Sequence, residues 1–285
     1  AGEFFSFLGP NGAGKTTTIS ILTTTLSKTS GEASIAGYDL EKEAPKVRKN
    51  IGVIFQNPSL DPNLSAEENV RFHAVLYGMY SFSPTYSFMP ESYKKRVMEL
   101  ASVLEIEKEM FRPIKGFSGG MKRKLEIVRS LMHSPRVLFL DEPTAGLDPD
   151  SRRNLWAYLQ DVREKEKTTI FLTTHYLEEA EGADRVCIIN DGKVVSLGTT
   201  DDIKKDLTQE VLVIDASNRD ELEAELRRMK LRYKRNGAFE VDLRRANAQK
   251  IIKALKSPLT YLDIQRPSLE DAYLAIIRNK NGKGE

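Results

Sequence analysis

One cysteine, no long apolar run and almost no net charge limit what this chain of 285 residues can be. The cysteine, Cys187, excludes an internal disulfide, and its place in the apolar run VCII predicts a small buried side chain rather than a reactive thiol. No apolar run approaches the roughly 18 residues that a membrane-spanning helix needs. The formal net charge of +2 gives no strong field that would attract nucleic acid or an anionic membrane. Partners must therefore be inferred from local sites, and we expect no nucleic acid among them.

The length of the chain is enough for one large domain, or for a large and a small one, with a substantial core. The sequence begins without Met and enters an apolar strand pattern almost at once. We therefore expect residues to be missing before Ala1.

A strand pattern that ends in two acids is the centre of the predicted site. Val137 to Leu140 are consecutive large apolar residues, too few for a helix, and predict a central strand of a parallel sheet covered on both faces. Asp141 and Glu142 follow where that strand leaves the core, and Pro143 ends it. Because ligands bind at the carboxyl ends of strands in open α/β sheets, this carboxylate pair favours a metal and a water.

A phosphate-binding loop is predicted near the start of the chain. An apolar strand pattern leads into GPNGAGKT at Gly9 to Thr16, which has the spacing GxxxxGK(S/T) of a P-loop. In such a loop the glycines let backbone N–H groups surround the phosphates, Lys15 neutralises them and Thr16 can hold Mg²⁺. The helix that follows, predicted from Gly14 to about Ser27, would add the partial positive charge of its N-terminus. The sequence therefore predicts nucleotide binding.

A histidine is expected at the same edge of the sheet. Thr169 to Thr173 predict a further buried strand, and His175 follows its end. It would lie beside the strand ends that carry Lys15 and Asp141, so contact with a phosphate outweighs a structural role. The other two histidines have no such placement and are expected to be structural.

A helix with glycines at its start forms another candidate anion site. The segment Phe117 to Met121 reads FSGGM and precedes a helix predicted from Lys122 to Met132, with Ser118 as its cap. Bare N–H groups at a helix start can bind an anion, although a Ser-Gly-Gly cap alone is most often a plain turn. The basic side chains at 122–124 are expected to form a solvated face.

Two further regions leave their roles open. Ser65 to Glu68 is a capping-box pattern that opens a helix, and the insert at Gly78 to Pro90 is rich in aromatic residues. The insert is either a loop with packed aromatics, which we favour, or a surface for a partner. From Gln209 onward the pattern is βαββαβ with an extra helix, which matches a ferredoxin-like arrangement and implies no function by itself. We favour a role for that region in stabilising a dimer or regulating the ATPase activity. The alternative is that it binds a ligand.

Six motifs in this order resemble the nucleotide-binding domain of the ATP-binding cassette family: GPNGAGKTT, Gln56, FSGGM, VLFLDEP, AGLD and the histidine of TTH. The resemblance covers Ala1 to about Leu207. The run FSGGMKRKLEIVRSL and the tail PSLEDAYL are similar to the daunorubicin-type multidrug exporter ATPases, which have a small C-terminal domain. The resemblance implies an α/β P-loop NTPase fold with a mixed, mainly parallel sheet over 1–207, a helical subdomain at about 57–135 and further strands before residue 1. Residues 208–285 would form an α+β, ferredoxin-like domain.

The resemblance also assigns roles to residues. Glu142 would polarise the attacking water as general base, His175 would touch the γ-phosphate, and Gln56 would contact both metal and water. The implied cofactors are ATP and Mg²⁺, with Mg²⁺ held by Thr16, Gln56 and Asp141. The nucleotide-binding residues would be Gly9, Pro10, Asn11, Gly12, Ala13, Gly14, Lys15, Thr16 and Thr17 of one copy, with Ser118, Gly119, Gly120 and Asp148 of the other.

The implied partners are a second copy of the nucleotide-binding domain and an integral membrane permease subunit, at the cytoplasmic face of the cell membrane. The alternative is a soluble cassette ATPase of DNA repair or translation. Such proteins carry long coiled coils, zinc motifs or two cassettes in one chain, and none of these is present in the sequence. The transported substrate stays open.

Two departures from the family pattern affect the site. The usual signature is LSGGQ, and Phe117 and Met121 stand here in place of Leu and Gln. Met121 cannot donate a side-chain hydrogen bond, although the backbone donors remain. In the family the aromatic residue that stacks on adenine precedes the P-loop, so it is expected to lie before Ala1.

Overall fold

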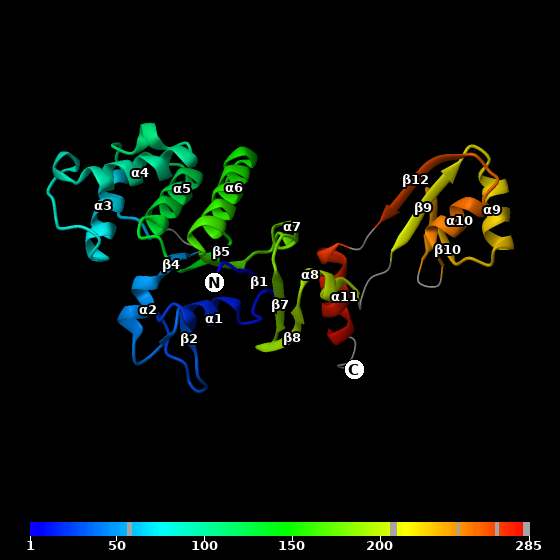
Figure 1. Cartoon of the computed structure of the whole chain (residues 1–285), viewed down its shortest axis with the longest axis horizontal. Coiled ribbons are helices and arrows are strands. Elements are labelled where there is room, and N and C mark those ends of the chain that lie inside the picture. Colours follow the sequence, from blue (N-terminus) through cyan, green and yellow to red (C-terminus); the bar gives the residue numbers. More distant parts are fainter. Residues whose placement is uncertain (56–58, 206–209, 244–245, 266–267, 282–285) are drawn as a thin grey trace. The chain divides into compact units, whose positions relative to one another are not determined.

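The chain forms two compact units, residues 1–197 and 198–285. The computed structural model in Figure 1 describes residues 1–55, 59–205, 210–243, 246–265 and 268–281. The predicted domain boundary after Leu207 therefore lies outside the described residues. The structure groups α8 (Thr200–Lys205) with the second unit, where it contacts α11 (Leu269–Asn281), although its residues fall within the range predicted for the first domain. No helix among the described residues is both long and apolar enough to cross a membrane.

The first unit is built on a six-stranded sheet with the strand order β4-β5-β6-β1-β7-β8. Its strands are β1 (Phe4–Leu8), β4 (Ile51–Ile54), β5 (Val137–Asp141), β6 (Thr169–Thr173), β7 (Arg185–Asn190) and β8 (Lys193–Gly198). The first five in this order are paired in parallel, and β7 and β8 are joined at Asp191 and Gly192, which both have positive φ as a tight hairpin turn requires. The predicted α/β fold with a mainly parallel sheet is confirmed.

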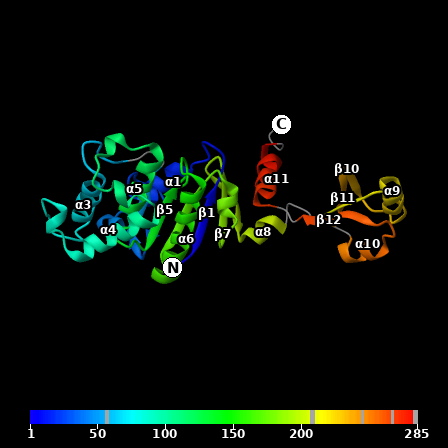
Figure 2. The ribbon, with the colours of Figure 1, turned by 90° about the horizontal axis from the view of Figure 1, so that it is seen from above.

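Three helices between β4 and β5 pack on one another, and Figure 2 shows them grouped at one side of the first unit. They are α3 (Ala66–Leu76), α4 (Glu91–Val103) and α5 (Gly119–Leu131). The predicted capping box is present, because Glu68 N donates to Ser65 Oγ over 3.2 Å and Ser65 N donates back to Glu68 Oε2 over 2.7 Å. The other helices and strands of this unit are α1 (Lys15–Leu22), β2 (Ser34–Ile35), β3 (Tyr38–Asp39), α2 (Ala44–Asn50), α6 (Pro149–Glu166) and α7 (Leu177–Ala180), with 3₁₀ turns at Tyr86–Phe88, Glu107–Glu109 and Ile114–Gly116.

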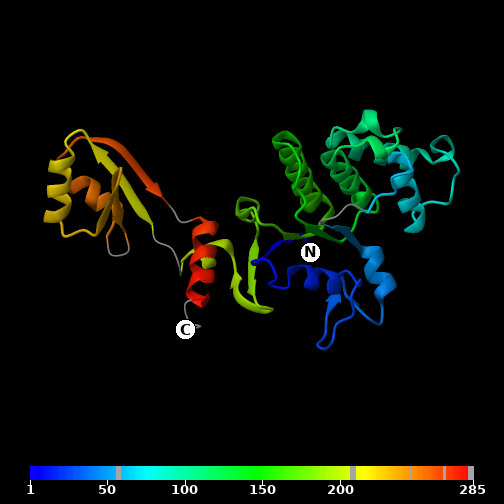
Figure 3. The same cartoon turned by 180° about the vertical axis from the view of Figure 1, so that it is seen from behind.

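Strand β5 is buried on both faces, as its unbroken apolar run predicted. Leu138, Phe139 and Leu140 are each at most 2% exposed. Phe139 packs in a cluster with Ile51 and part of α1, while α6 lies on the opposite face of the sheet (Figures 1 and 3). Burial of these three side chains stabilises the strand and fixes the position of the acids at its end.

Helix α1 ends earlier than predicted. It stops at Leu22 rather than near Ser27, because three consecutive threonines close its last turn. Thr23 Oγ1 donates to Ile19 O over 2.8 Å, Thr25 Oγ1 donates to Ser20 O over 2.9 Å, and Thr24 between them has φ +62°. Hydroxyl groups that bond nearby carbonyls compete with helix continuation.

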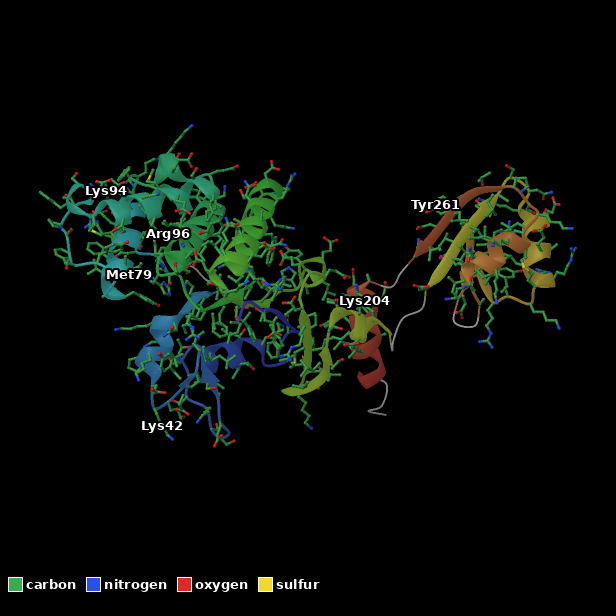
Figure 4. All side chains as sticks on the ribbon, viewed as in Figure 1. Lys42, Met79, Lys94, Arg96, Lys204 and Tyr261 are labelled. Carbon is green, nitrogen blue, oxygen red and sulfur yellow. The ribbon has the colours of Figure 1, made fainter. Side chains whose placement is uncertain are left out.

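The aromatic insert at 78–90 is partly packed and partly exposed. The ring of Tyr86 meets that of Tyr93 edge-on at 6.3 Å between centroids, and Met89 is 2% exposed. Phe82 and Phe88, by contrast, are 65% and 73% exposed. Figure 4 labels Met79, which lies in this helical part of the first unit. Both interpretations of the insert thus retain some support.

The second unit contains a four-stranded antiparallel sheet in the order β10-β11-β9-β12. Its elements are β9 (Val211–Ala216), α9 (Arg219–Arg228), β10 (Tyr233–Asn236), β11 (Ala238–Asp242), α10 (Ala248–Ala254) and β12 (Leu259–Gln265). The core is formed by sheet residues such as Ile214 and Phe239 and helix residues such as Leu226 and Ile251. This is the predicted ferredoxin-like arrangement.

A buried ion pair lies at the centre of the helical part. Arg71 Nε lies 3.1 Å from Glu67 Oε1, and both side chains are 3% exposed. Tyr93 Oη donates to the same carboxylate oxygen over 2.9 Å. Because a buried carboxylate without a cation is strongly unfavourable, the helical part depends on this pair being complete.

We expect Arg71→Ala to lower the free energy of unfolding by about 3–5 kcal/mol, because Glu67 would be left charged and buried. Urea denaturation followed by the fluorescence of Trp156, the chain's single tryptophan, reports on the first unit. Arg153→Ala is the control, since the pair of Arg153 with Asp150 is 76% exposed on both sides. Equal shifts of the midpoint in the two variants would contradict this expectation.

Candidate functional site

Three neighbouring parallel strands bring the predicted residues to one edge of the sheet. β6 lies between β5 and β1, and Asp141 is paired with Thr173 across the β5–β6 boundary. The P-loop follows β1, the acids follow β5 and His175 follows β6. Because parallel strands end at the same edge, these segments meet there although they are far apart in the sequence.

The P-loop folds around its own lysine. Lys15 Nζ donates to Gly9 O over 2.7 Å and to Pro10 O over 3.1 Å. Gly12 and Gly14 have φ values of +80° and +103°, which glycine adopts without strain. Burial lowers the pKa of Lys15, and the carboxylates of Glu142 and Asp141 oppose this effect. The cation is therefore held within electrostatic reach of both acids.

Glu142 and His175 are in direct contact. His175 Nδ1 lies 3.1 Å from Glu142 Oε1, and the carboxylate side chain is 22% exposed. The backbone of Glu142 has φ +50°, which is unusual for a residue other than glycine. Its N–H still donates to Thr173 O over 2.9 Å, so the turn begins directly at the end of β5. A carboxylate that is held by a partner and remains accessible can accept a proton from a water.

Asp141 and Thr16 have the donor atoms that Mg²⁺ requires. Asp141 is 7% exposed, and one of its carboxylate oxygens accepts a hydrogen bond from the Thr173 hydroxyl. Thr16 is exposed at the start of α1. The described part of the chain has no group of three or more His, Cys, Asp or Glu residues that would enclose a metal. Mg²⁺ bound with a nucleotide needs only one or two protein oxygens, because phosphates and waters complete its shell, so these residues fit the ion. Gln56 lies outside the described residues.

The remaining predicted residues form a second group around α5 and α6. Ser118 caps α5 by accepting from Met121 N over 3.2 Å, and both Ser118 and Gly119 are exposed. A Cβ on Gly120 would lie 2.9 Å from Gly146 O, so only glycine fits there without a shift. Asp148 caps α6, and its hydrogen bonds from Ser151 lower the pKa of Asp148 to about 2.

One buried residue of the site was missed. Arg123 was expected on a solvated face with its two lysine neighbours, but its side chain is 4% exposed. It donates hydrogen bonds to the backbone carbonyls of Asp141 and Glu142, each over 2.7 Å. The spacing carried a signal, because Arg123 lies one helical turn before the buried Ile127 and thus on the same face of α5.

Comparisons with known proteins agree with this geometry. A family model described as ABC transporter matches residues 1–145. The chain is 33% identical to the linearmycin resistance ATP-binding protein LnrL of Bacillus subtilis (strain 168), over 96% of this chain and 89% of that protein. It is 40% identical to the daunorubicin/doxorubicin resistance ATP-binding protein DrrA of Streptomyces peucetius, over 78% of this chain and 66% of that protein.

Solved structures show the same similarity. An ATP-binding subunit of an ABC transporter matches with a TM-score of 0.64 and 32% identity, over 72% of this chain and 81% of that one. A dimeric ATP-binding cassette bound to ADP and Pi matches with a TM-score of 0.62 and 28% identity, over 70% of this chain and 85% of that one. In both cases the similarity extends beyond the fold to the sequence.

Gly9→Ala tests the packing of the P-loop. A Cβ at Gly9 would lie 2.5 Å from Ile189 O, so the loop has to move. We expect ATP affinity to fall by about 1–3 kcal/mol, roughly fivefold to 150-fold, as measured by titration calorimetry. Gly116→Ala is the control, since a Cβ there meets nothing within 4 Å. ATP affinity that is unchanged in Gly9→Ala would show that this close contact does not shape the loop.

Proposed function

The chain belongs to the ABC transporter family, and we propose that it is the ATP-hydrolysing, energy-coupling subunit of an exporter. Two copies hold ATP between them, and hydrolysis drives a separate membrane subunit. The observation that carries the proposal is the meeting of Lys15 with the contacting pair Glu142 and His175 at one sheet edge. A phosphate-binding cation and a candidate base are thereby present in one site.

The P-loop binds and orients the nucleotide. Its N–H groups and the N-terminus of α1 surround the phosphates, while Lys15 supplies positive charge to the β- and γ-phosphates. Lys15 Nζ is held on Gly9 O and Pro10 O, a position from which it can turn to phosphate oxygens. Thr16 and Asp141 would hold Mg²⁺, which neutralises charge that develops on the phosphate oxygens.

Glu142 accepts the proton of the attacking water. Its carboxylate lies at the end of the rigid strand β5, and His175 fixes its direction through the 3.1 Å contact. A base that is positioned in this way contributes typically a hundredfold to ten-thousandfold to a rate. The other ring nitrogen of His175 then remains available for the γ-phosphate.

A second copy completes the site. Ser118 and Gly119 are exposed at the start of α5, where their hydroxyl and N–H groups can reach a phosphate on another molecule. Asp148 lies beside helix α5, since Lys124 Nζ is 3.9 Å from its carboxylate. The similarity to a dimeric cassette bound to ADP and Pi supports this arrangement.

Export is supported by the relatives. LnrL and DrrA are named as drug-resistance ATP-binding proteins, and another relative is a Nod factor export ATP-binding protein. These names favour export over the alternative of DNA repair or translation. A membrane permease subunit would then hold the chain at the cytoplasmic face of the membrane.

Glu142→Gln tests the assignment of the base. We expect the variant to bind ATP but to hydrolyse it at least about a hundredfold more slowly, because an amide cannot accept the proton. The ATP-bound dimer should then accumulate and elute early on a sizing column. Glu178→Gln, at an exposed position shortly after His175, is the control and should elute as a monomer after turnover. Hydrolysis by Glu142→Gln at the normal rate would refute the assignment.

A further inference from the structure

Arg123 is a buried cation on a helix whose neighbouring basic residues are more exposed. Its side chain is 4% exposed, and it lies in the second turn of α5 (Gly119–Leu131). A buried guanidinium requires partners for its N–H groups, because an unpaired buried charge is very costly. The partners of Arg123 therefore show what it is positioned to do.

Three of these partners are consecutive backbone carbonyls at the end of β5. Arg123 Nη2 donates to Asp141 O and to Glu142 O, both over 2.7 Å, and Nε donates to Pro143 O over 3.0 Å. The carbonyls converge on one side chain because Glu142 has φ +50°, which turns the chain sharply after the strand. The planar fork of arginine matches such a set of acceptors, whereas the point charge of lysine does not.

The other arm of the guanidinium reaches a different strand. Arg123 Nη1 donates to Phe55 O, just after β4 (Ile51–Ile54), and lies 3.4 Å from Glu126 Oε2. Glu126 is 2% exposed, and its other oxygen accepts from Ser59 N over 2.7 Å. Arg129 Nη1 donates to Ser59 O over 2.7 Å. Three residues of α5 thus bind the described residues on both sides of 56–58.

We propose that Arg123 is the positioning residue for the catalytic carboxylate: it holds the backbone turn at Glu142 and ties that turn to the end of β4. The inference rests on the proposed role of Glu142 as base. The left-handed backbone conformation of Glu142 sets the direction in which its side chain points. Loss of the three carbonyl contacts lets the turn relax, and the carboxylate then moves away from the attacking water. Arg123 itself is buried and acts through the backbone.

The test compares Arg123→Lys with Arg129→Lys. Both keep the charge on α5 and next to Glu126, but Arg129 bonds Ser59 and Glu126 and none of the three carbonyls. We expect kcat for ATP to fall about tenfold to a hundredfold in Arg123→Lys, as for a misplaced catalytic group, with KM within about threefold of wild type. Arg129→Lys should keep kcat within about threefold. An equal loss of kcat in both variants, or a rise in KM with kcat retained, would overturn the proposal.

A double variant separates positioning from general damage to the fold. If Arg123 acts through Glu142, then adding Arg123→Lys to Glu142→Gln should cause no further loss of the residual rate. Losses that multiply would show that Arg123 acts independently of the base. Should Arg123→Lys fail to fold, the pair Arg123→Gln with Glu126→Gln removes both charges of that ion pair while Arg129 keeps its hydrogen bonds to Ser59, and it is expected to lose kcat in the same range. In that event kcat at the level of Arg129→Lys would overturn the proposal.

The proposed function and this inference fail in different ways. If Glu142→Gln hydrolyses ATP normally, the assignment of the base is wrong. If Glu142→Gln stalls but Arg123→Lys matches Arg129→Lys, the base stands and only the positioning role is lost.

Discussion

The site depends on the register of three neighbouring parallel strands, β5, β6 and β1. Asp141 is paired with Thr173 across two of them, and the Thr173 hydroxyl donates to the Asp141 carboxylate. A slip of one residue would move Phe139 from its cluster with Ile51 to the other covered face of the sheet and would separate Asp141 from Thr173, so packing on both faces fixes this register. The P-loop, the acids and His175 each follow a strand end, and the register therefore sets their mutual positions. The same packing of the strands therefore stabilises the sheet and positions the residues of the candidate site.

Helix α5 connects the inside of the site with its proposed outer surface. Its first turn is exposed at Ser118, where a second copy would meet the nucleotide, while its second turn carries the buried Arg123. The two turns are rigidly joined by the helix, and Gly120 packs against Gly146 on the loop that follows Glu142. Under the proposals, contact with the second copy acts on the same helix that holds the catalytic carboxylate. This places recognition of the partner and alignment of the base within one short element.

Local patterns predicted most of the fold and of the site. The apolar run of β5, the capping box at Ser65 and the P-loop spacing each reflect interactions between residues close in sequence. The burial of Arg123 was not predicted, because its acceptors lie at Phe55 and at Asp141 to Pro143, and only the tertiary fold brings them together. The early end of α1 was not predicted, because helix propensities alone do not show that the threonine hydroxyls bond nearby carbonyls and end the helix there. Gln56 lies outside the described residues, and its role stays a prediction.

Under the proposed function, Lys15 of one copy and Ser118 of another form one site. Lys15→Ala and Ser118→Arg should each abolish ATP hydrolysis, the first by loss of phosphate binding and the second by displacing the nucleotide from the one site that this Ser118 completes. In a mixture of the two variants, a mixed dimer contains one site with neither substitution. The decisive measurement is the ATPase rate of that mixture. We predict recovery to roughly a quarter of the wild-type rate, as random pairing into two-fold dimers gives. A mixture as inactive as either variant alone would contradict a site shared between two copies.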